Sequence, residues 1–163
     1  MKHLLSFAPA ARAAGLGLLL ALSALCAQAQ GDAAATPGDG REGTFKTVQG
    51  DVTLVRGNTR NAAVVGAGLQ LADRVLTGPA SATAVVLKDG TTLSIGPDSA
   101  LDLSEFSFDP TTQEGSLLVA LARGSLRMVT GLIAKLRPEQ VKVTTPTTVI
   151  GVRGTDFIVE QRP

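Results

Sequence analysis

Short apolar segments alternating with polar residues run from about Thr44 to Glu160. They are rich in Val, Leu, Ile and Thr, and Gly, Asp, Asn or Pro separates them at intervals of roughly 8 to 12 residues, which is typical of all-β domains. A period of two places successive side chains on opposite faces of a sheet, and no helical period competes with it over most of this region. The pattern therefore predicts an all-β domain of short strands and tight turns over residues 44–163.

One hairpin is predicted around Asp89-Gly90, which suits a type I′ turn because both central residues of that turn have positive φ. This turn places Val86 opposite Leu93. It also places Ala84 opposite Ile95, so that one face of the hairpin is wholly apolar, as a core-facing sheet requires.

A second hairpin is predicted around Arg123-Gly124 by the same reasoning. It places Leu121 opposite Leu126, and Val119 opposite Met128. Two registers that each collect the apolar side chains on one face favour strands over helices.

These registers, and the alternation of the aromatic residues, predict which side chains form the core. We expect the core to include Val86, Leu93, Phe106, Phe108, Val119, Leu121, Leu126 and Phe157. Residues 131–137 have some helical character but stop at Pro138, and seven residues predict no more than a loop or a single turn.

The first 29 residues have the features of a secretory signal peptide. Lys2 and Arg12 supply positive charge, residues 13–26 are apolar, and Ala27-Gln28-Ala29 offers a small-x-small cleavage pattern. The apolar run is shorter than the roughly 20 residues of a membrane-spanning helix, so no stable span is expected after cleavage. We therefore expect a periplasmic or secreted protein.

Residues 30–43 are small, polar and rich in glycine, so they predict a flexible linker. The residue before Cys26 is Leu25, where lipid attachment ordinarily requires a small residue, so no lipoprotein is expected. The expected organisation is a signal peptide (1–29), a linker (30–43) and one β domain (44–163), a length sufficient for a single core.

Cleavage would remove His3 and Cys26, the only histidine and cysteine of the chain. Imidazole and thiolate metal sites, and catalysis by Ser-His-Asp or Cys-His groups, would then lack their residues. The four nearby carboxylates of Asp98, Asp102, Glu105 and Asp109 do not have the spacing of a calcium loop. We therefore expect no cofactor, no metal and no enzymatic activity.

The charge of the mature chain argues against nucleic acid as a partner. Signal removal takes two of the 15 basic residues and none of the 14 acidic ones, which leaves a net charge of −1. Basic residues nevertheless gather in the C-terminal part, where they are candidates for contact with an acidic partner or an anionic polymer, or else form a solvated face. They are Arg123, Arg127, Lys135, Arg137, Lys142 and Arg153.

Four stretches in order resemble the FecR domain, a periplasmic module of transmembrane regulators in iron-uptake signalling that also occurs in stand-alone exported proteins. The stretches are residues 48–52, 73–78, 87–99, and 145–146 followed by 152–157. The resemblance implies a compact solenoid-like or two-layer β fold and no catalytic residues. In place of the family's usual glycine before Asp73 the chain has Ala72, which requires a negative or mildly strained φ.

Two functions follow as expectations. The first is a non-enzymatic periplasmic sensing or protein-interaction module, active in envelope signalling and bound to another envelope protein. The second is a structural protein that binds cell wall or anionic polysaccharide. Residues 155–160 predict a strand at a sheet edge, so Ile158 is the candidate point at which a partner, or a second copy of this chain, adds a strand. The nearby basic residues would select an acidic partner.

Overall fold

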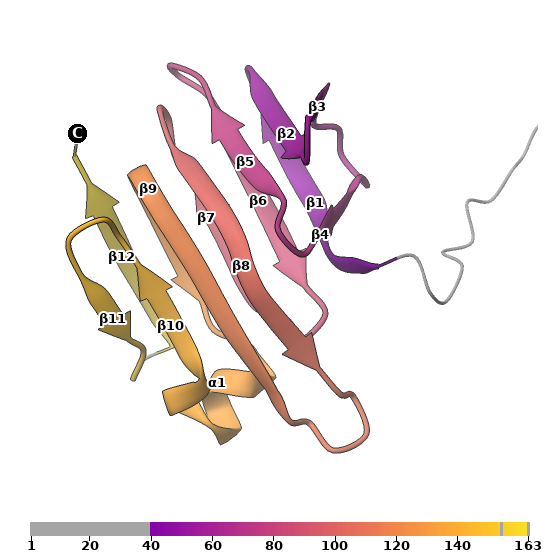
Figure 1. Cartoon of the computed structure of the whole chain (residues 1–163), viewed down its shortest axis with the longest axis vertical. Coiled ribbons are helices and arrows are strands. Elements are labelled where there is room, and N and C mark those ends of the chain that lie inside the picture. Colours follow the sequence, from indigo (N-terminus) through magenta and orange to yellow (C-terminus); the bar gives the residue numbers. More distant parts are fainter. Residues whose placement is uncertain (1–39, 154, 163) are drawn as a thin grey trace, which may run out of the picture. The chain divides into compact units, whose positions relative to one another are not determined.

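Strands of three to fifteen residues make up most of residues 40–153 and 155–162, which are the residues that the computed structural model describes (Figure 1). The predicted signal peptide and residues 30–39 of the predicted linker lie outside them. In chain order the strands are β1 (Arg41–Gln49), β2 (Val52–Arg56), β3 (Thr59–Ala62), β4 (Gly68–Gln70), β5 (Arg74–Thr77), β6 (Ala82–Leu87), β7 (Thr92–Ile95), β8 (Ala100–Phe108), β9 (Gly115–Val129), β10 (Val141–Thr144), β11 (Val149–Gly151) and β12 (Asp156–Gln161). The first strand begins at Arg41, three residues before the domain boundary that the sequence predicted.

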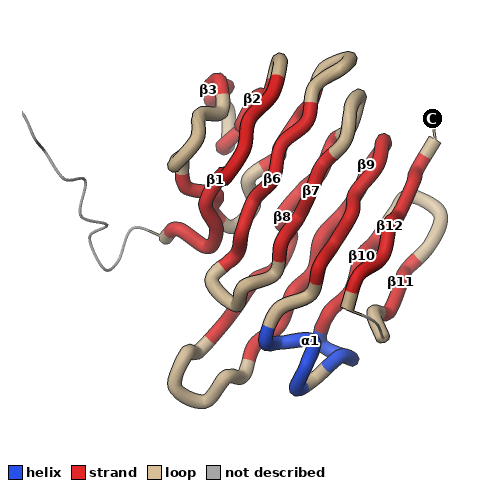
Figure 2. Tube along the Cα trace, turned by 180° about the vertical axis from the view of Figure 1, so that it is seen from behind, coloured by secondary structure: helices blue, strands red, loops and turns tan. Residues whose placement is uncertain are grey.

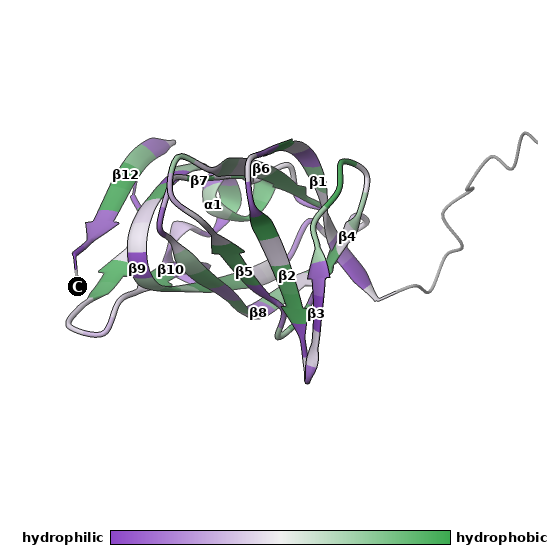
Figure 3. Ribbon diagram, turned by 90° about the horizontal axis from the view of Figure 1, so that it is seen from above, coloured by the Kyte–Doolittle hydropathy of each residue, from purple (hydrophilic) through white to green (hydrophobic). Residues whose placement is uncertain are grey.

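Strand β9 belongs to two layers. Sheet A has the strand order β4-β1-β6-β7-β9-β12, and sheet B has the order β3-β2-β5-β8-β9-β10-β11. Every pair is antiparallel except β9 with β10. Figure 3 shows the two sheets facing each other, so the predicted all-β class is confirmed, and of the two predicted arrangements, solenoid-like or two-layer, the domain has two layers.

The predicted hairpin at Arg123-Gly124 is wrong, because the chain bends there without reversing. The first half of β9 pairs with β8 and β10, and the second half with β7 and β12. Gly124, at φ +91°, lies at the bend. A hairpin and a bent strand give the same order of apolar and polar residues along the chain, so the sequence pattern does not distinguish them. Here the continuing strand pairs with neighbouring strands of both sheets.

The hairpin between β6 and β7 exists, but its predicted register is wrong by one residue. Val85, not Val86, lies opposite Leu93. The Gly90 N–H donates to the carbonyl of Leu87 at 3.0 Å, which makes a three-residue loop in place of a two-residue turn. The added residue moves Val86 to the outer face of sheet A, where it is half-buried.

The register makes a direct stability prediction. Val85→Ala should lower the free energy of unfolding by about 2 kcal/mol, because two fully buried methyl groups are lost. Val86→Ala should cost less than about 1 kcal/mol, because that side chain is partly exposed. Urea denaturation of both variants measures the difference. A larger loss for Val86→Ala than for Val85→Ala would instead support the two-residue turn predicted from the sequence, in which Val86 faces the core.

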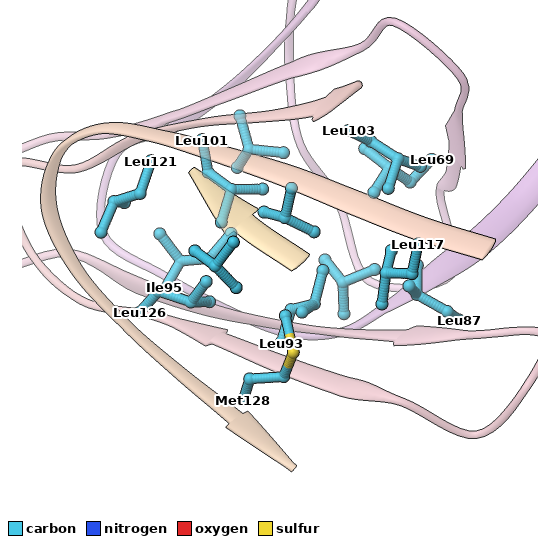
Figure 4. Close-up of a cluster of buried hydrophobic side chains, with 14 of the residues drawn as sticks. Leu69, Leu87, Leu93, Ile95, Leu101, Leu103, Leu117, Leu121, Leu126 and Met128 are labelled. Carbon is cyan, nitrogen blue, oxygen red and sulfur yellow. The ribbon is translucent and has the colours of Figure 1, made fainter. Parts of the chain in front are cut away.

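The space between the sheets is filled by aliphatic side chains from both layers (Figure 4). The predicted core positions Leu93, Phe106, Val119, Leu121 and Leu126 are buried, whereas Phe108 and Phe157 are partly buried and pack against the core. Val86 was a wrong prediction, for the reason given above.

A short helix, α1 (Leu132–Leu136), follows β9 at one end of the strands (Figures 1 and 2), and a 3-10 turn follows it (Pro138–Gln140). It inserts Ile133, only 1% exposed, into the core. The length of five residues agrees with the single turn that the sequence predicted. Within the described part of the chain, none of the helices has the length and hydrophobicity needed to cross a bilayer.

Candidate interaction surface

The polar residues of the most recognisable sequence stretches are buried and bind to the fold itself. The carboxylate of Asp89 accepts hydrogen bonds from the N–H and the hydroxyl of Thr91, at 3.0 and 2.7 Å. The hydroxyl of Thr91 accepts one from the N–H of Gly131, at 3.0 Å. This network joins the β6–β7 loop to the chain that enters α1.

A second buried carboxylate is that of Asp73, which lies just before β5. Arg56 donates two hydrogen bonds to it, at 2.8 and 2.7 Å, and the N–H of Gln70 donates a third at 2.7 Å. The preceding Ala72 has φ +63°, so this position takes the left-handed conformation that glycine would adopt without strain.

Hydroxyl groups hold a third corner, where the β7–β8 turn meets β5 and β9. The Ser99 N–H donates to the hydroxyl of Thr77 at 2.9 Å, and that hydroxyl donates to the Gly96 carbonyl at 2.6 Å. The Ser99 hydroxyl accepts from the N–H of Ser125 at 3.0 Å. These hydroxyls are buried and paired, so they form no exposed nucleophile.

The basic residues proposed as partner contacts lie on several elements, and two of them are paired. Arg127 donates to both carboxylate oxygens of Asp156, at 2.9 and 2.5 Å, and Arg137 pairs with Glu114. The remaining predicted residues are exposed and form no ion pair among the described residues. They are Arg123 at the bend of β9, Lys135 in α1, Lys142 in β10, and Arg153 between β11 and β12.

The ion pair with Arg127 has an electrostatic consequence for Asp156. Hydrogen bonding to the Arg127 guanidinium lowers the pKa of the Asp156 carboxyl below its usual range. Arg127→Gln should therefore raise the pKa of Asp156, as measured by carbon NMR titration of side-chain carboxyls. A carboxylate whose pKa is lowered in the folded state contributes stability above its unfolded pKa and loses it as pH falls through the folded pKa.

Asp109 provides the internal control for that titration. Backbone N–H groups of Thr111 and Thr112 donate to its carboxylate and lower its pKa. The pKa of Asp109 should stay unchanged in Arg127→Gln, since no guanidinium contributes to it. Equal shifts of Asp109 and Asp156 would contradict this assignment.

The acidic residues between positions 98 and 109 do not converge. Asp102 pairs with Arg74 at 2.5 Å, Glu105 accepts from the hydroxyl of Ser116 at 2.7 Å, and Asp109 binds its own turn. Among residues 40–153 and 155–162, no group of three or more His, Cys, Asp or Glu side chains could hold a metal ion.

A shallow groove of about 410 Å³ crosses the outer face of sheet A. Cross-strand pairing aligns Thr47, Ala84, Ser94, Arg127 and Ile158 in one row over five strands. The small side chains of β6 and β7 form its floor, and Arg127, Ile158 and Glu160 close the end at β12. The sequence did not predict this groove, because the misplaced register assigned Ala84 to the buried face.

Strand β12 lies at the border of sheet A (Figures 1 and 2), and among the described strands it pairs only with β9. Its Ile158 is 65% exposed, which is high for a large aliphatic side chain, whereas Val159 is buried. The predicted edge position of this strand is confirmed. The groove and the β12 edge together define the candidate interaction surface.

A two-layer β domain with buried polar corners and an open edge strand is the class that the geometry defines. The model of the FecR protein family matches residues 73–163, which is more than half of the chain, and the chain belongs to this family. The match includes three of the four stretches that suggested the resemblance, and the first, at residues 48–52, lies before it.

Other comparisons add little. A solved structure described as "Cell surface anchoring domain" is 28% identical, and the match covers 37% of this chain and 80% of that one. The TM-score is 0.36, which does not establish a shared fold. No curated protein matches the sequence.

Proposed function

We propose that this protein is a non-enzymatic interaction module of the cell envelope, exported to the periplasm or beyond, that takes part in envelope signalling by binding another envelope protein. Membership of the FecR family supports the envelope setting. The observation that carries the proposal is the open edge of β12 beside the groove, with Ile158 exposed at its centre.

The use of polar groups supports an interaction role over catalysis. Asp73, Asp89, Thr91 and Ser99 are buried and bound to internal partners. An acid and base that act together need to face one substrate position. The exposed carboxylates described above are instead engaged one by one with different partners.

Binding to an anionic polysaccharide is supported less well than binding to a protein. Two of the six candidate basic residues are neutralised by ion pairs, and the other four lie on separate elements. Small side chains form the floor of the groove, and among the described residues that line it there is no aromatic ring on which a sugar could stack.

Site-specific crosslinking in cells tests the proposal. A photoreactive amino acid at Ile158 should give one defined adduct that protease digests and mass spectrometry identifies as a protein. The same amino acid at Arg60, exposed on β3, an edge strand of sheet B, is the matched control and should give no such adduct. A polysaccharide adduct, no adduct, or equal adducts from both positions would reject the proposal.

A further inference from the structure

We infer that β12 binds its partner by accepting an extended segment as an added strand, and that this segment carries basic side chains on both sides of an apolar one. The inference rests on the proposed function and specifies the chemistry of the partner. It combines the direction of the backbone groups of β12 with the charges that flank Ile158.

The backbone of β12 offers hydrogen-bonding groups to an added strand. The N–H of Thr130, the residue after β9, donates to the carbonyl of Thr155, the residue before β12, at 2.9 Å. These two residues are partners because the register pairs the adjacent residues Val129 and Asp156. Because antiparallel residues alternate between facing the partner and facing away, Phe157 and Val159 bond to β9. The N–H and C=O groups of Asp156, Ile158 and Glu160 therefore point away from β9, toward the open edge.

A second hydrogen bond gives the same assignment independently. The N–H of Gly96 donates to the carbonyl of its register partner Ser125 at 3.0 Å, so Ser125 and Arg127 direct their backbone groups toward β7. The intervening residues Leu126 and Met128 then face β12. Three outward residues of β12 are thus free to pair with another strand.

The side chains that an added strand would meet directly have a defined pattern. On the outer face these are Asp156, Ile158 and Glu160, all exposed, in the order acidic, apolar, acidic. On the inner face Phe157 is only partly buried and packs against the core. Opposite charges stabilise directly facing cross-strand positions, so the complementary segment is basic, apolar, basic at alternate residues.

A second copy of this chain fits the edge poorly. Antiparallel self-pairing centred on Ile158 would place Asp156 opposite Glu160 twice, and like charges in that position are destabilising. A shift of two residues would place Asp156 opposite Arg162, but would set Ile158 against Glu160. The pattern therefore favours a different partner.

The charges at this edge favour a basic segment, whereas the sequence led us to expect an acidic partner. Arg127 lies on β9, one strand behind the edge, and its guanidinium is engaged with Asp156. Glu160 forms no ion pair with any residue in the described part of the chain. Its carboxylate is thus an unneutralised negative charge on the outer face of β12, next to the position of an added strand.

Synthetic peptides test the inference on the purified chain. The probe is a fluorescein-labelled peptide, Ser-Lys-Thr-Val-Thr-Lys-Ser, and its counterpart has Glu in place of both Lys. Fluorescence anisotropy should show about tenfold tighter binding of the basic peptide at low salt, since two facing charge pairs change sign. The ratio should shrink as salt is added, and should disappear in the double variant Asp156→Asn, Glu160→Gln.

The backbone half of the inference is tested separately. Ile158→Pro removes an outward N–H and should abolish binding of the basic peptide while leaving pairing with β9 intact. Ala62→Pro is the matched control: the N–H of Ala63 donates to Val52, its register partner on β2, so Ala62 faces away from β2 on an edge strand. A peptide N-methylated at its central Val should also lose binding, which tests strand addition without altering the protein.

Each negative outcome has a distinct meaning. Unchanged binding of the N-methylated peptide, or equal loss from Ala62→Pro and Ile158→Pro, would overturn strand addition. Equal binding of both peptides would overturn the charge pattern. If light scattering shows that the protein is a dimer and that Ile158→Pro is a monomer, the added strand comes from a second copy of this chain, which would overturn the inferred basic partner. A protein adduct at Ile158 without peptide binding would leave the proposed function standing and reject this inference alone.

Discussion

Replacing Gly124 with alanine should destabilise the protein by about 3 to 6 kcal/mol, a large part of a typical domain's stability. The positive φ of +91° costs an alanine about 1 to 2 kcal/mol. A Cβ atom there would also lie 2.5 Å from the Cα of Ser99, which is backbone and cannot rotate away. The displaced Ser99 would lose its hydrogen bond with Ser125. Chemical denaturation measures the loss.

Gly90→Ala is the matched control for this variant. Gly90 has a similar φ of +84°, but a Cβ atom there would meet nothing within 4 Å. We expect a cost of only about 1 to 2 kcal/mol from the backbone conformation. Equal losses for the two variants would show that crowding against Ser99 contributes nothing, and that the bend of β9 tolerates a side chain.

Phe45→Ala should lower the free energy of unfolding by about 3 to 5 kcal/mol, because the ring is fully buried and its removal leaves a cavity between the sheets. Thermal and urea unfolding both measure the effect. This loss of stability should leave peptide binding at β12 unchanged, because β6, β7 and β9 separate β1 from β12 in sheet A.

Phe157→Ala removes the same side chain as Phe45→Ala, but from a partly buried position, so the two variants compare partial with full burial. Phe157 packs against the core but retains exposed surface, so its truncation should cost about 1 to 2 kcal/mol. A cost equal to that of Phe45→Ala would mean that β12 is covered more fully than its place at the sheet edge implies.

The sequence predicted the class of fold better than the connections between strands. Alternation identified the strands and most core residues, because burial on one face is a local property of the pattern. The pairing of strands was harder to predict. At Asp89-Gly90 the loop has three residues instead of two, and the buried carboxylate of Asp89 binds Thr91 in it. At Gly124 the strand bends and continues, and the order of apolar and polar residues is the same as it would be in a hairpin.

The candidate surface was only partly predictable. The alternation near the C-terminal end predicted the strand that contains Ile158, and the structure places this strand at the edge of sheet A. The groove did not, because it depends on residues from five strands whose registers are set by tertiary contacts. Nor could the sequence show that Arg127 is paired with Asp156, 29 positions away.

The sharing of β9 between both sheets has a consequence for how the protein folds. β9 pairs with strands before it, β7 and β8, and with strands after it, β10 and β12. Sheet A is therefore complete only when β12, which ends at Gln161, has paired, and sheet B only when β11, which ends at Gly151, has paired. Contacts so distant in sequence make folding slow, in the range of milliseconds to seconds for all-β domains. The C-terminal strands must therefore be available before the domain can close, and the binding edge forms together with the fold.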